Sequence, residues 1–208
     1  DHRDLHRGDS RQRHMCIRDR PIILVLVNGR PLALQWEKEN IPAIIETWYP
    51  GEEGGNAIAD VLFGDYNPGG KLPISFPKEL GQLPVYYNRV SLAFNQYIST
   101  DAQALFPFGH GLSYTRFEYS DLNISPKEIK SLEKIAIQCK VKNIGHQAGD
   151  EVIQLYIQDP IASLVRPVKE LKGFKRIHLE PDEERTIVFT LFPDQLAFYD
   201  EHMRLIIE

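Results

Sequence analysis

The chain has 208 residues with 24 Lys and Arg against 29 Asp and Glu, giving a net charge of −5. This length suits one large or two small domains, and the acidic balance argues against nucleic acid or an anionic membrane as partner. The longest apolar run, residues 22–27, is far shorter than the ~18–20 residues of a membrane span. Two cysteines, Cys16 and Cys139, cannot build a disulfide framework, and we expect Cys139 to be a buried free thiol.

The first 20 residues differ in composition from the rest. They hold six arginines and four aspartates, which leaves 18 basic and 25 acidic residues, net −7, in the remainder. They show neither a strand nor a helix period. Residues 15–20 (MCIRDR) resemble translated adapter sequence. We therefore expect residues 1–20 to be a non-native or disordered head rather than part of the fold.

The next region alternates between strand and helix patterns. Residues 22–27 (IILVLV) form a continuous aliphatic run, which is typical of a strand covered on both faces in a parallel sheet. Residues 42–48 are a second strand candidate. Residues 52–63 predict a helix with an acidic first turn, and Gly64 predicts its end.

Two further segments complete this region. Residues 72–76 predict a strand that Pro73 places at a sheet edge or a strand start. Residues 77–111 are rich in aromatic residues and turn signals and predict a loop. Strand, helix and strand in succession predict an α/β layer over residues 21–111.

From residue 112 onward the apolar period changes to 2. Alternating segments cover residues 135–142, 153–158 and 187–191, and turn signals separate them. This spacing predicts a β-sandwich of immunoglobulin-like type over residues 112–208. The predicted core includes Leu155, Ile157, Phe189 and Leu191.

Sequence patterns for cofactor or metal sites are absent. Residues 64–71 (GDYNPGGK) have the wrong spacing for a phosphate loop, and residues 51–55 (GEEGG) lack the dinucleotide fingerprint. The histidines after the head are scattered, with no second ligand at metal spacing. Glu52 and Glu53 follow a predicted strand, where α/β sheets bind ligands, but adjacent helix positions do not face one bond. We therefore expect no cofactor, no metal and, for these two carboxylates, a helix-dipole role ahead of a catalytic one.

Five longer motifs resemble one enzyme family. Residues 48–65 (WYPGEEGGNAIADVLFGD) and 67–73 (NPGGKLP) closely resemble the C-terminal α/β sandwich of glycoside hydrolase family 3. Residues 105–115 (LFPFGHGLSYT) resemble that family's link into its fibronectin type III-like domain, which residues 168–174 (VKELKGF) and 198–200 (FYD) also resemble. The resemblance covers residues 21–208.

The resemblance implies a retaining exo-acting β-glycosidase, a β-glucosidase or β-xylosidase, that hydrolyses terminal β-linked sugars. Retention uses two carboxyls about 5–5.5 Å apart. In this family the nucleophile belongs to an N-terminal (β/α)8 barrel, and the acid/base glutamate lies upstream of the segment that residues 22–27 match. Neither motif has a counterpart in this chain, so no residue is assigned as catalytic.

The resemblance thus predicts a C-terminal fragment, inactive alone, whose partners are an oligosaccharide or β-glycoside substrate and the barrel of the same chain. A final strand is expected beyond residue 208. Asn28, Arg30, Trp48 and Glu52 are the candidates for lining the substrate cleft, with turn formation and helix capping as the alternative for each. Periplasmic, secreted and cytoplasmic locations all stay open.

A non-catalytic carbohydrate-binding or structural β-sandwich module is the alternative function. Such sugar-binding modules usually present a stripe of exposed aromatic side chains. Tyr156 is the only outward aromatic residue in the three alternating segments, which disfavours this alternative.

Overall fold

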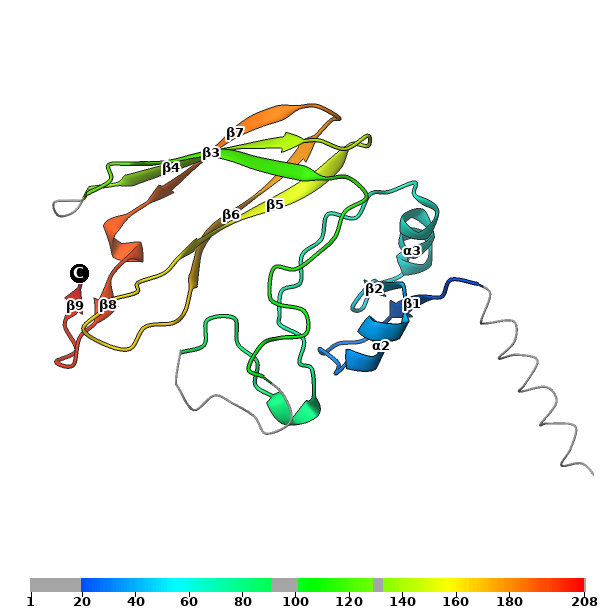
Figure 1. Ribbon diagram of the computed structural model, residues 1–208, viewed down its shortest axis with the longest axis horizontal. Coiled ribbons are helices and arrows are strands. Elements are labelled where there is room, and N and C mark those ends of the chain that lie inside the picture. The colour runs from blue at the N-terminus through cyan, green and yellow to red at the C-terminus, as the bar shows by residue number, and fades with distance from the viewer. Residues whose placement is uncertain (1–19, 91–100, 129–132, 208) are drawn as a thin grey trace, which may run out of the picture.

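A computed structural model describes residues 20–90, 101–128 and 133–207, so most of the predicted head lies outside the described residues. The α/β part contains β1 (Ile23–Leu26), α2 (Gln35–Asn40), β2 (Ala43–Glu46) and α3 (Gly54–Phe63). β1 and β2 pair in parallel, with Leu26 opposite Glu46. The two helices lie on either side of this pair in Figure 1. The two predicted strands and the helix between residues 52 and 63 are therefore present.

The helix boundaries correct one expectation, agree with another and add a helix that was not predicted. α3 begins at Gly54 with Glu53 as its N-cap, so Glu52 and Glu53 precede the helix instead of forming its first turn. It ends at Gly64, whose φ of 87° requires a residue without a Cβ. α2 was not predicted, because its six residues include a single apolar side chain, Trp36, which is 64% exposed.

The strand predicted at residues 72–76 is wrong. Phe76 forms only an isolated antiparallel bridge with Phe106. A second pair of backbone hydrogen bonds joins Leu72 to Gly109 and His110 at 2.8 Å. Pro73 and Pro107 lie between these contacts and lack the N–H groups that a continuous ladder would need.

The second part is a sandwich of two antiparallel sheets, which Figure 1 shows as an upper and a lower layer. One sheet has the order β3-β4-β7 and the other pairs β5 with β6. Their bounds are β3 (Phe117–Ser125), β4 (Ile135–Asn143), β5 (Gly149–Ile157), β6 (Glu170–Leu179) and β7 (Glu184–Leu191). The alternation predicted for three of these strands is confirmed by inward burial in β4 and β7.

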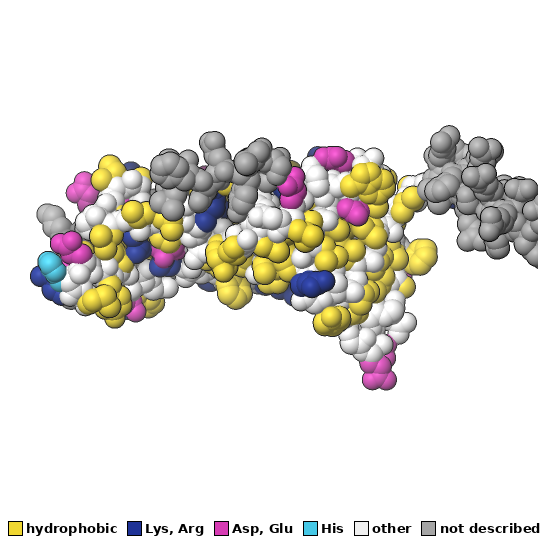
Figure 2. Space-filling model, turned by 90° about the horizontal axis from the view of Figure 1, so that it is seen from below, with side chains coloured by type: hydrophobic (Ala, Val, Ile, Leu, Met, Phe, Trp, Pro, Cys, Tyr) yellow, Lys and Arg dark blue, Asp and Glu magenta, His cyan; other side chains and the backbone are white. Residues whose placement is uncertain are grey.

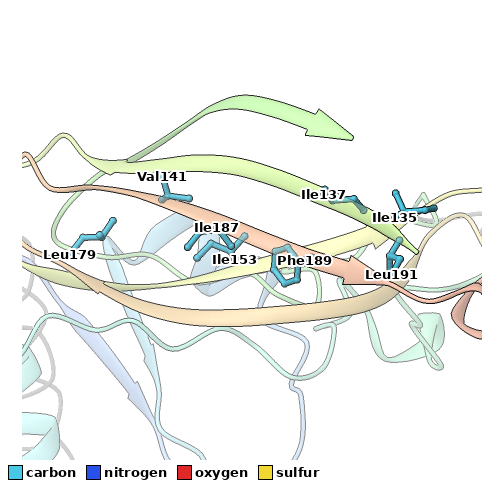
Figure 3. Close-up of a cluster of buried hydrophobic side chains, with 8 residues drawn as sticks. All are labelled: Ile135, Ile137, Val141, Ile153, Leu179, Ile187, Phe189 and Leu191. Atoms are coloured by element: carbon cyan, nitrogen blue, oxygen red, sulfur yellow. The ribbon is translucent and has the colours of Figure 1, made fainter. Parts of the chain in front are cut away.

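The sandwich core lies between the two sheets (Figure 3). Its buried residues come from β4 to β7: Ile135, Ile137, Val141, Ile153, Leu179, Ile187, Phe189 and Leu191. Of the predicted core residues, Phe189 and Leu191 are buried, whereas Leu155 and Ile157 are partly buried and pack against the cluster. Cys139 is free and only partly buried, and burial raises the pKa of its thiol.

Short elements complete the described chain. They are η1 (Leu80–Gln82), η2 (Pro193–Gln195), β8 (Phe198–Tyr199) and β9 (Leu205–Ile206), the last two paired antiparallel. Across residues 20–90, 101–128 and 133–207, no helix is long and apolar enough to cross a membrane.

The turn after α3 joins the α/β part to the sandwich. Asn67 Nδ2 donates to the carbonyl of Ala148 at 2.9 Å, and Asn67 Oδ1 accepts from Ser113 Oγ and from the Tyr114 amide. A Cβ on Gly69 would lie 2.7 Å from the Cβ of Asp150, so only glycine allows this close approach to the start of β5. The turn thereby covers part of the free edge of β5, which protects it from non-native pairing.

Candidate functional site

The candidate site lies where the two parallel strands end. Leu26 ends β1 and Glu46 ends β2, and the two residues are directly opposite each other. Thr47 continues the contact, because its amide and its hydroxyl both donate to the carbonyl of Leu26, at 3.0 and 2.7 Å. The loops that begin at Val27 and Thr47 therefore leave the same edge of the sheet, which is where α/β sheets bind ligands.

Glu46 joins these two loops through its carboxylate. Its Oε2 accepts from Asn28 Nδ2 at 3.2 Å, and its Oε1 accepts from the Trp48 amide at 3.0 Å. Asn28 Oδ1 in turn accepts from the Arg30 amide at 3.2 Å. One carboxylate thus connects Asn28, Arg30 and Trp48, three of the four predicted cleft residues.

Trp48 adopts a strained backbone conformation at this point. Its φ is 54°, a value that bulky residues rarely adopt and that costs about 1–3 kcal/mol. Its ring packs against Phe76 with 5.9 Å between centroids, at the rim of a small core formed by Leu34, Phe76 and Leu105. The Glu46 bond to the Trp48 amide and this ring packing hold the strained turn in place.

A glycine allows the two loops to approach each other. A Cβ on Gly29 would lie 2.6 Å from Cε2 of Tyr49. These atoms lie at the far end of the Tyr49 side chain, which is 77% exposed, so a larger residue at position 29 would displace the Tyr49 ring from its contact with the β1 loop.

The remaining predicted positions are less constrained. The side chains of Arg30 and Glu52 are exposed, and within the described residues neither makes a hydrogen bond or an ion pair. Glu52 lies in the turn before α3 and is not linked to the Glu46 network. The structure therefore groups Asn28, Arg30 and Trp48 but does not bring Glu52 to them.

Sequence reasoning missed Glu46, although a signal for it exists. Glu46 is the charged residue that ends an otherwise aliphatic strand, and in a parallel sheet that position faces the ligand edge. A carboxylate placed there has to find partners in the loops around it.

One titratable side chain, His110, lies beside this small core. His110 stacks on Phe106 with 5.4 Å between ring centroids. Burial first, and then the charges of Lys71 and Lys38, lower the pKa of His110, which keeps the imidazole neutral. Within the residues that the structure describes, no group of three or more His, Cys, Asp and Glu side chains could hold a metal ion. The loops of the candidate site offer hydrogen-bonding groups to a ligand.

Comparison with known proteins supplies the family. The model of the glycosyl hydrolase family 3 C-terminal domain matches residues 7–114, and that of the fibronectin type III-like domain matches residues 151–208. The chain belongs to glycosyl hydrolase family 3. The first match begins at residue 7, inside the segment that composition sets apart, so the head at residues 1–20 stays a prediction, as do the domain boundaries at residues 111 and 112.

Two curated family 3 relatives show how much of such a protein this chain covers. It is 47% identical over 196 residues to the periplasmic beta-glucosidase of Salmonella typhimurium, covering 89% of this chain and 26% of that protein. It is 45% identical over 193 residues to a beta-xylosidase of Formosa agariphila, covering 91% and 27%. The chain thus spans about a quarter of the length of these relatives.

A solved β-glucosidase structure has the same fold. The β-glucosidase of Erythrobacter marinus superposes with a TM-score of 0.84 at 44% identity, covering 89% of this chain and 25% of that protein. The match spans most of both parts of this chain. The fold class predicted from the sequence, an α/β sandwich fragment followed by a fibronectin type III-like sandwich, is therefore confirmed.

Proposed function

We propose that this chain is the C-terminal portion of a retaining exo-acting β-glycosidase that removes terminal β-linked glucose or xylose. The observation that carries the proposal is the 47% identity to a β-glucosidase over 89% of the chain, together with 45% identity to a β-xylosidase. The substrate is a β-glycoside or an oligosaccharide, and the two reacting carboxyls of a retaining mechanism come from segments that precede residue 21 in the longer protein.

The surface of the α/β part supports an association with further protein. β1 and β2 form a two-stranded sheet, and the aliphatic run predicted to be covered on both faces leaves Ile22, Ile23 and Val27 42–58% exposed. Figure 2 shows hydrophobic side chains gathered at the surface of this half of the molecule. Hydrophobic side chains that gather on an exposed surface are typical of an interface. We propose that the (β/α)8 barrel and the rest of the α/β sandwich cover it.

The proposed role of the loops is to form one wall of the substrate cleft. Asn28 and Arg30 offer donors and acceptors for sugar hydroxyls, Trp48 is joined to Asn28 through Glu46, and Glu52 lies apart from them in the turn before α3. Glu46 fixes the loops before substrate arrives, so less ordering is needed on binding. In this proposal the residues of this chain position substrate, and they neither attack the glycosidic carbon nor protonate the leaving group.

An activity assay on the purified chain tests whether its residues only position substrate and do not react with it. We expect no hydrolysis of an aryl β-glucoside or an aryl β-xyloside above the rate in buffer. Turnover by the chain that is abolished by Glu52→Gln would contradict the proposal, because it would place a catalytic carboxyl at the start of α3. Circular dichroism should show that the unaltered chain and Glu52→Gln are both folded, so that a loss of turnover is not a loss of folding.

The alternative of a sugar-binding β-sandwich has less support. Tyr156, the platform that the sequence predicts, is partly buried: Lys169 Nζ lies 4.8 Å from the ring centroid, and the ring of Tyr87 packs edge-on at 6.0 Å. Calorimetric titration of the chain with xylo- and cello-oligosaccharides distinguishes the two functions. Saturable binding that Tyr156→Ala abolishes would favour the module.

A further inference from the structure

A segment of seven residues, 84–90, runs from the α/β part to the sandwich; we call it the arm. Its base is fixed by Gln82, which is 2% exposed. Gln82 Oε1 accepts from the Lys78 amide at 2.7 Å, and Nε2 donates to the carbonyls of Asp101 and Gln103 at 2.9 and 2.8 Å. These bonds use the amide group of a fully buried side chain, so the base of the arm is rigid.

The far end of the arm is held by the sandwich. The carbonyl of Arg89 accepts from the Val168 amide at 2.9 Å, and Val90 forms an antiparallel bridge with Pro167. Pro167 and Val168 belong to the connection between β5 and β6, and β6 begins at Glu170. The end of the arm is therefore held to this connection by one isolated bridge and one backbone hydrogen bond.

Tyr87 fixes the middle of the arm. Its ring stacks on Phe108 with 4.4 Å between centroids and an interplanar angle of 20°. The ring also packs edge-to-face with Tyr156 of β5. The Leu171 amide of β6 approaches the Tyr87 hydroxyl at 3.4 Å, a long and weak hydrogen bond. The ring stacking, rather than the hydroxyl, is thus the main contact.

Residues on either side of Tyr87 have the opposite environment. Tyr86 is 64% exposed and Asn88 is exposed, and with Arg89 they line a hollow of about 540 Å³. Within the described residues, the side chains of Tyr86, Asn88 and Arg89 make no hydrogen bond or ion pair. Tyr87 and Asn88 lie in a turn, in which the partly buried Tyr87 packs toward the sandwich while Tyr86 and Asn88 on either side of it are exposed.

We propose that the β-sandwich is a positioning module for the arm and that Tyr87 is the positioning residue. By packing Tyr156 on Tyr87 beside Phe108, and by holding Arg89 and Val90 through Val168 and Pro167, the sandwich decides which arm side chains face the hollow. This role goes beyond the packing and stability expected of the sandwich. It does not depend on the proposed glycosidase function, because it concerns contacts made within this chain.

Trypsin cleavage after Arg89 tests the proposal on the full chain. Cleavage requires the arm to leave the sandwich, and its rate follows the population of the released arm when release is fast. In the unaltered chain we expect the Arg89–Val90 bond to be cleaved at least about tenfold more slowly than the bond after the exposed Arg204. Tyr87→Ala should remove the stacking and raise the rate at Arg89 at least about tenfold.

Two matched variants separate positioning from general stability. Tyr86→Ala, an exposed neighbour, should leave cleavage at Arg89 unchanged, and Tyr87→Phe, which keeps the ring, should behave like the unaltered chain. In Tyr87→Ala the Val168 and Leu171 amides should exchange faster, while the Val141 amide in the core keeps its protection.

Three results would overturn the proposal. One is an Arg89–Val90 bond cleaved as fast as the Arg204 bond in the unaltered chain. The second is Tyr87→Phe cleaved as fast as Tyr87→Ala. The third is Tyr86→Ala with the same acceleration as Tyr87→Ala. The first result concerns the unaltered chain alone, so it decides the matter even where Tyr87→Ala unfolds.

Discussion

Lys71 and Glu151 form an ion pair across the junction between the α/β part and the β-sandwich. Lys71 Nζ lies 3.1 Å from Glu151 Oε2, and the side chains are 16% and 11% exposed. Lys71 also donates to the carbonyl of Gly111 at 3.0 Å, and Glu151 Oε1 accepts from the Tyr119 hydroxyl at 2.9 Å. Burial, and then the charge of Glu151, raise the pKa of Tyr119, so the phenol stays protonated and keeps donating.

Removing Lys71 should destabilise the chain by leaving Glu151 with an unpaired and mostly buried charge. We expect Lys71→Met to lower the free energy of unfolding by about 2 kcal/mol, measured by urea denaturation. In a Glu151→Gln background the same change should cost much less, because Gln still accepts from Tyr119 without a charge. As a control, Lys140→Met removes exposed pairs with Asp121 and Glu184 and should cost about 0.5 kcal/mol or less. Equal losses at Lys71 and Lys140 would contradict this account.

Asn67 should be the second determinant of the junction. Asn67→Ala removes three hydrogen bonds, to Ala148, Ser113 and Tyr114, and should lower the unfolding free energy by about 2 kcal/mol. The Tyr114 amide should then exchange faster with solvent, as followed by NMR. Asn56→Ala is the matched control, since the Asn56 side chain bonds only to exposed Glu53. An Asn67→Ala chain as stable as Asn56→Ala would show that the junction does not depend on this amide.

Stability should depend on pH through Asp150 and His178. His178 Nδ1 lies 2.7 Å from Asp150 Oδ1, and Arg176 Nε donates to Asp150 Oδ2 at 2.9 Å. The hydrogen bond with Asp150 raises the pKa of His178 from its ordinary 6.5. The bonds from His178 and Arg176 lower the pKa of Asp150 from its ordinary 3.8.

The sign of the effect follows from these two directions. The His178 contribution is complete below pH 6.5 and disappears as pH rises through its folded-state pKa, whereas that of Asp150 is present above pH 3.8 and disappears as pH falls through its own. We therefore expect His178→Gln to cost more stability at about pH 5 than at about pH 8.5, by urea denaturation. The same cost at both values would contradict a charged pair.

Glu46→Gln should loosen the two loops of the candidate site. Asn28 Nδ2 and the Trp48 amide bond to different oxygens of the carboxylate, and Gln replaces one of these oxygens by a donor NH2 group, so one of the two bonds is lost. We expect the amides of Arg30 and Trp48 to exchange about fivefold faster, because losing one hydrogen bond costs on the order of 1 kcal/mol. Glu52→Gln is the control and should leave both amides unchanged. Unchanged exchange in Glu46→Gln would remove Glu46 from the account of the site.

The sequence predicts the fold wherever the periodic burial is strong. The aliphatic run of β1 and the alternation in β4, β5 and β7 were identified, because side chains buried on one or both faces leave a pattern in the sequence. β3 left no such pattern, since eight of its nine residues are exposed. The six-residue α2 was missed because it contains a single apolar side chain. The strand predicted at residues 72–76 was wrong because prolines interrupt its backbone pairing.

That Asn28, Arg30, Trp48 and Glu52 line a substrate cleft stays a prediction. The first three are linked in the structure through Glu46, whereas Glu52 is not. Glu46 was missed because it belongs to the strand itself, and a period-based analysis treats its position as an end residue. The junction through Asn67, Lys71 and Glu151 depends on contacts between residues about 80 positions apart, which a single sequence does not reveal.

In the proposed function, this chain completes a β-glycosidase without supplying its reacting carboxyls. The most direct measurement is a chimera in which residues 21–208 replace the matching segment of the Salmonella typhimurium beta-glucosidase, assayed for aryl β-glucoside hydrolysis beside the isolated chain. The account predicts turnover by the chimera and none by the isolated chain. Hydrolysis by the isolated chain, or a folded chimera without turnover, would contradict it.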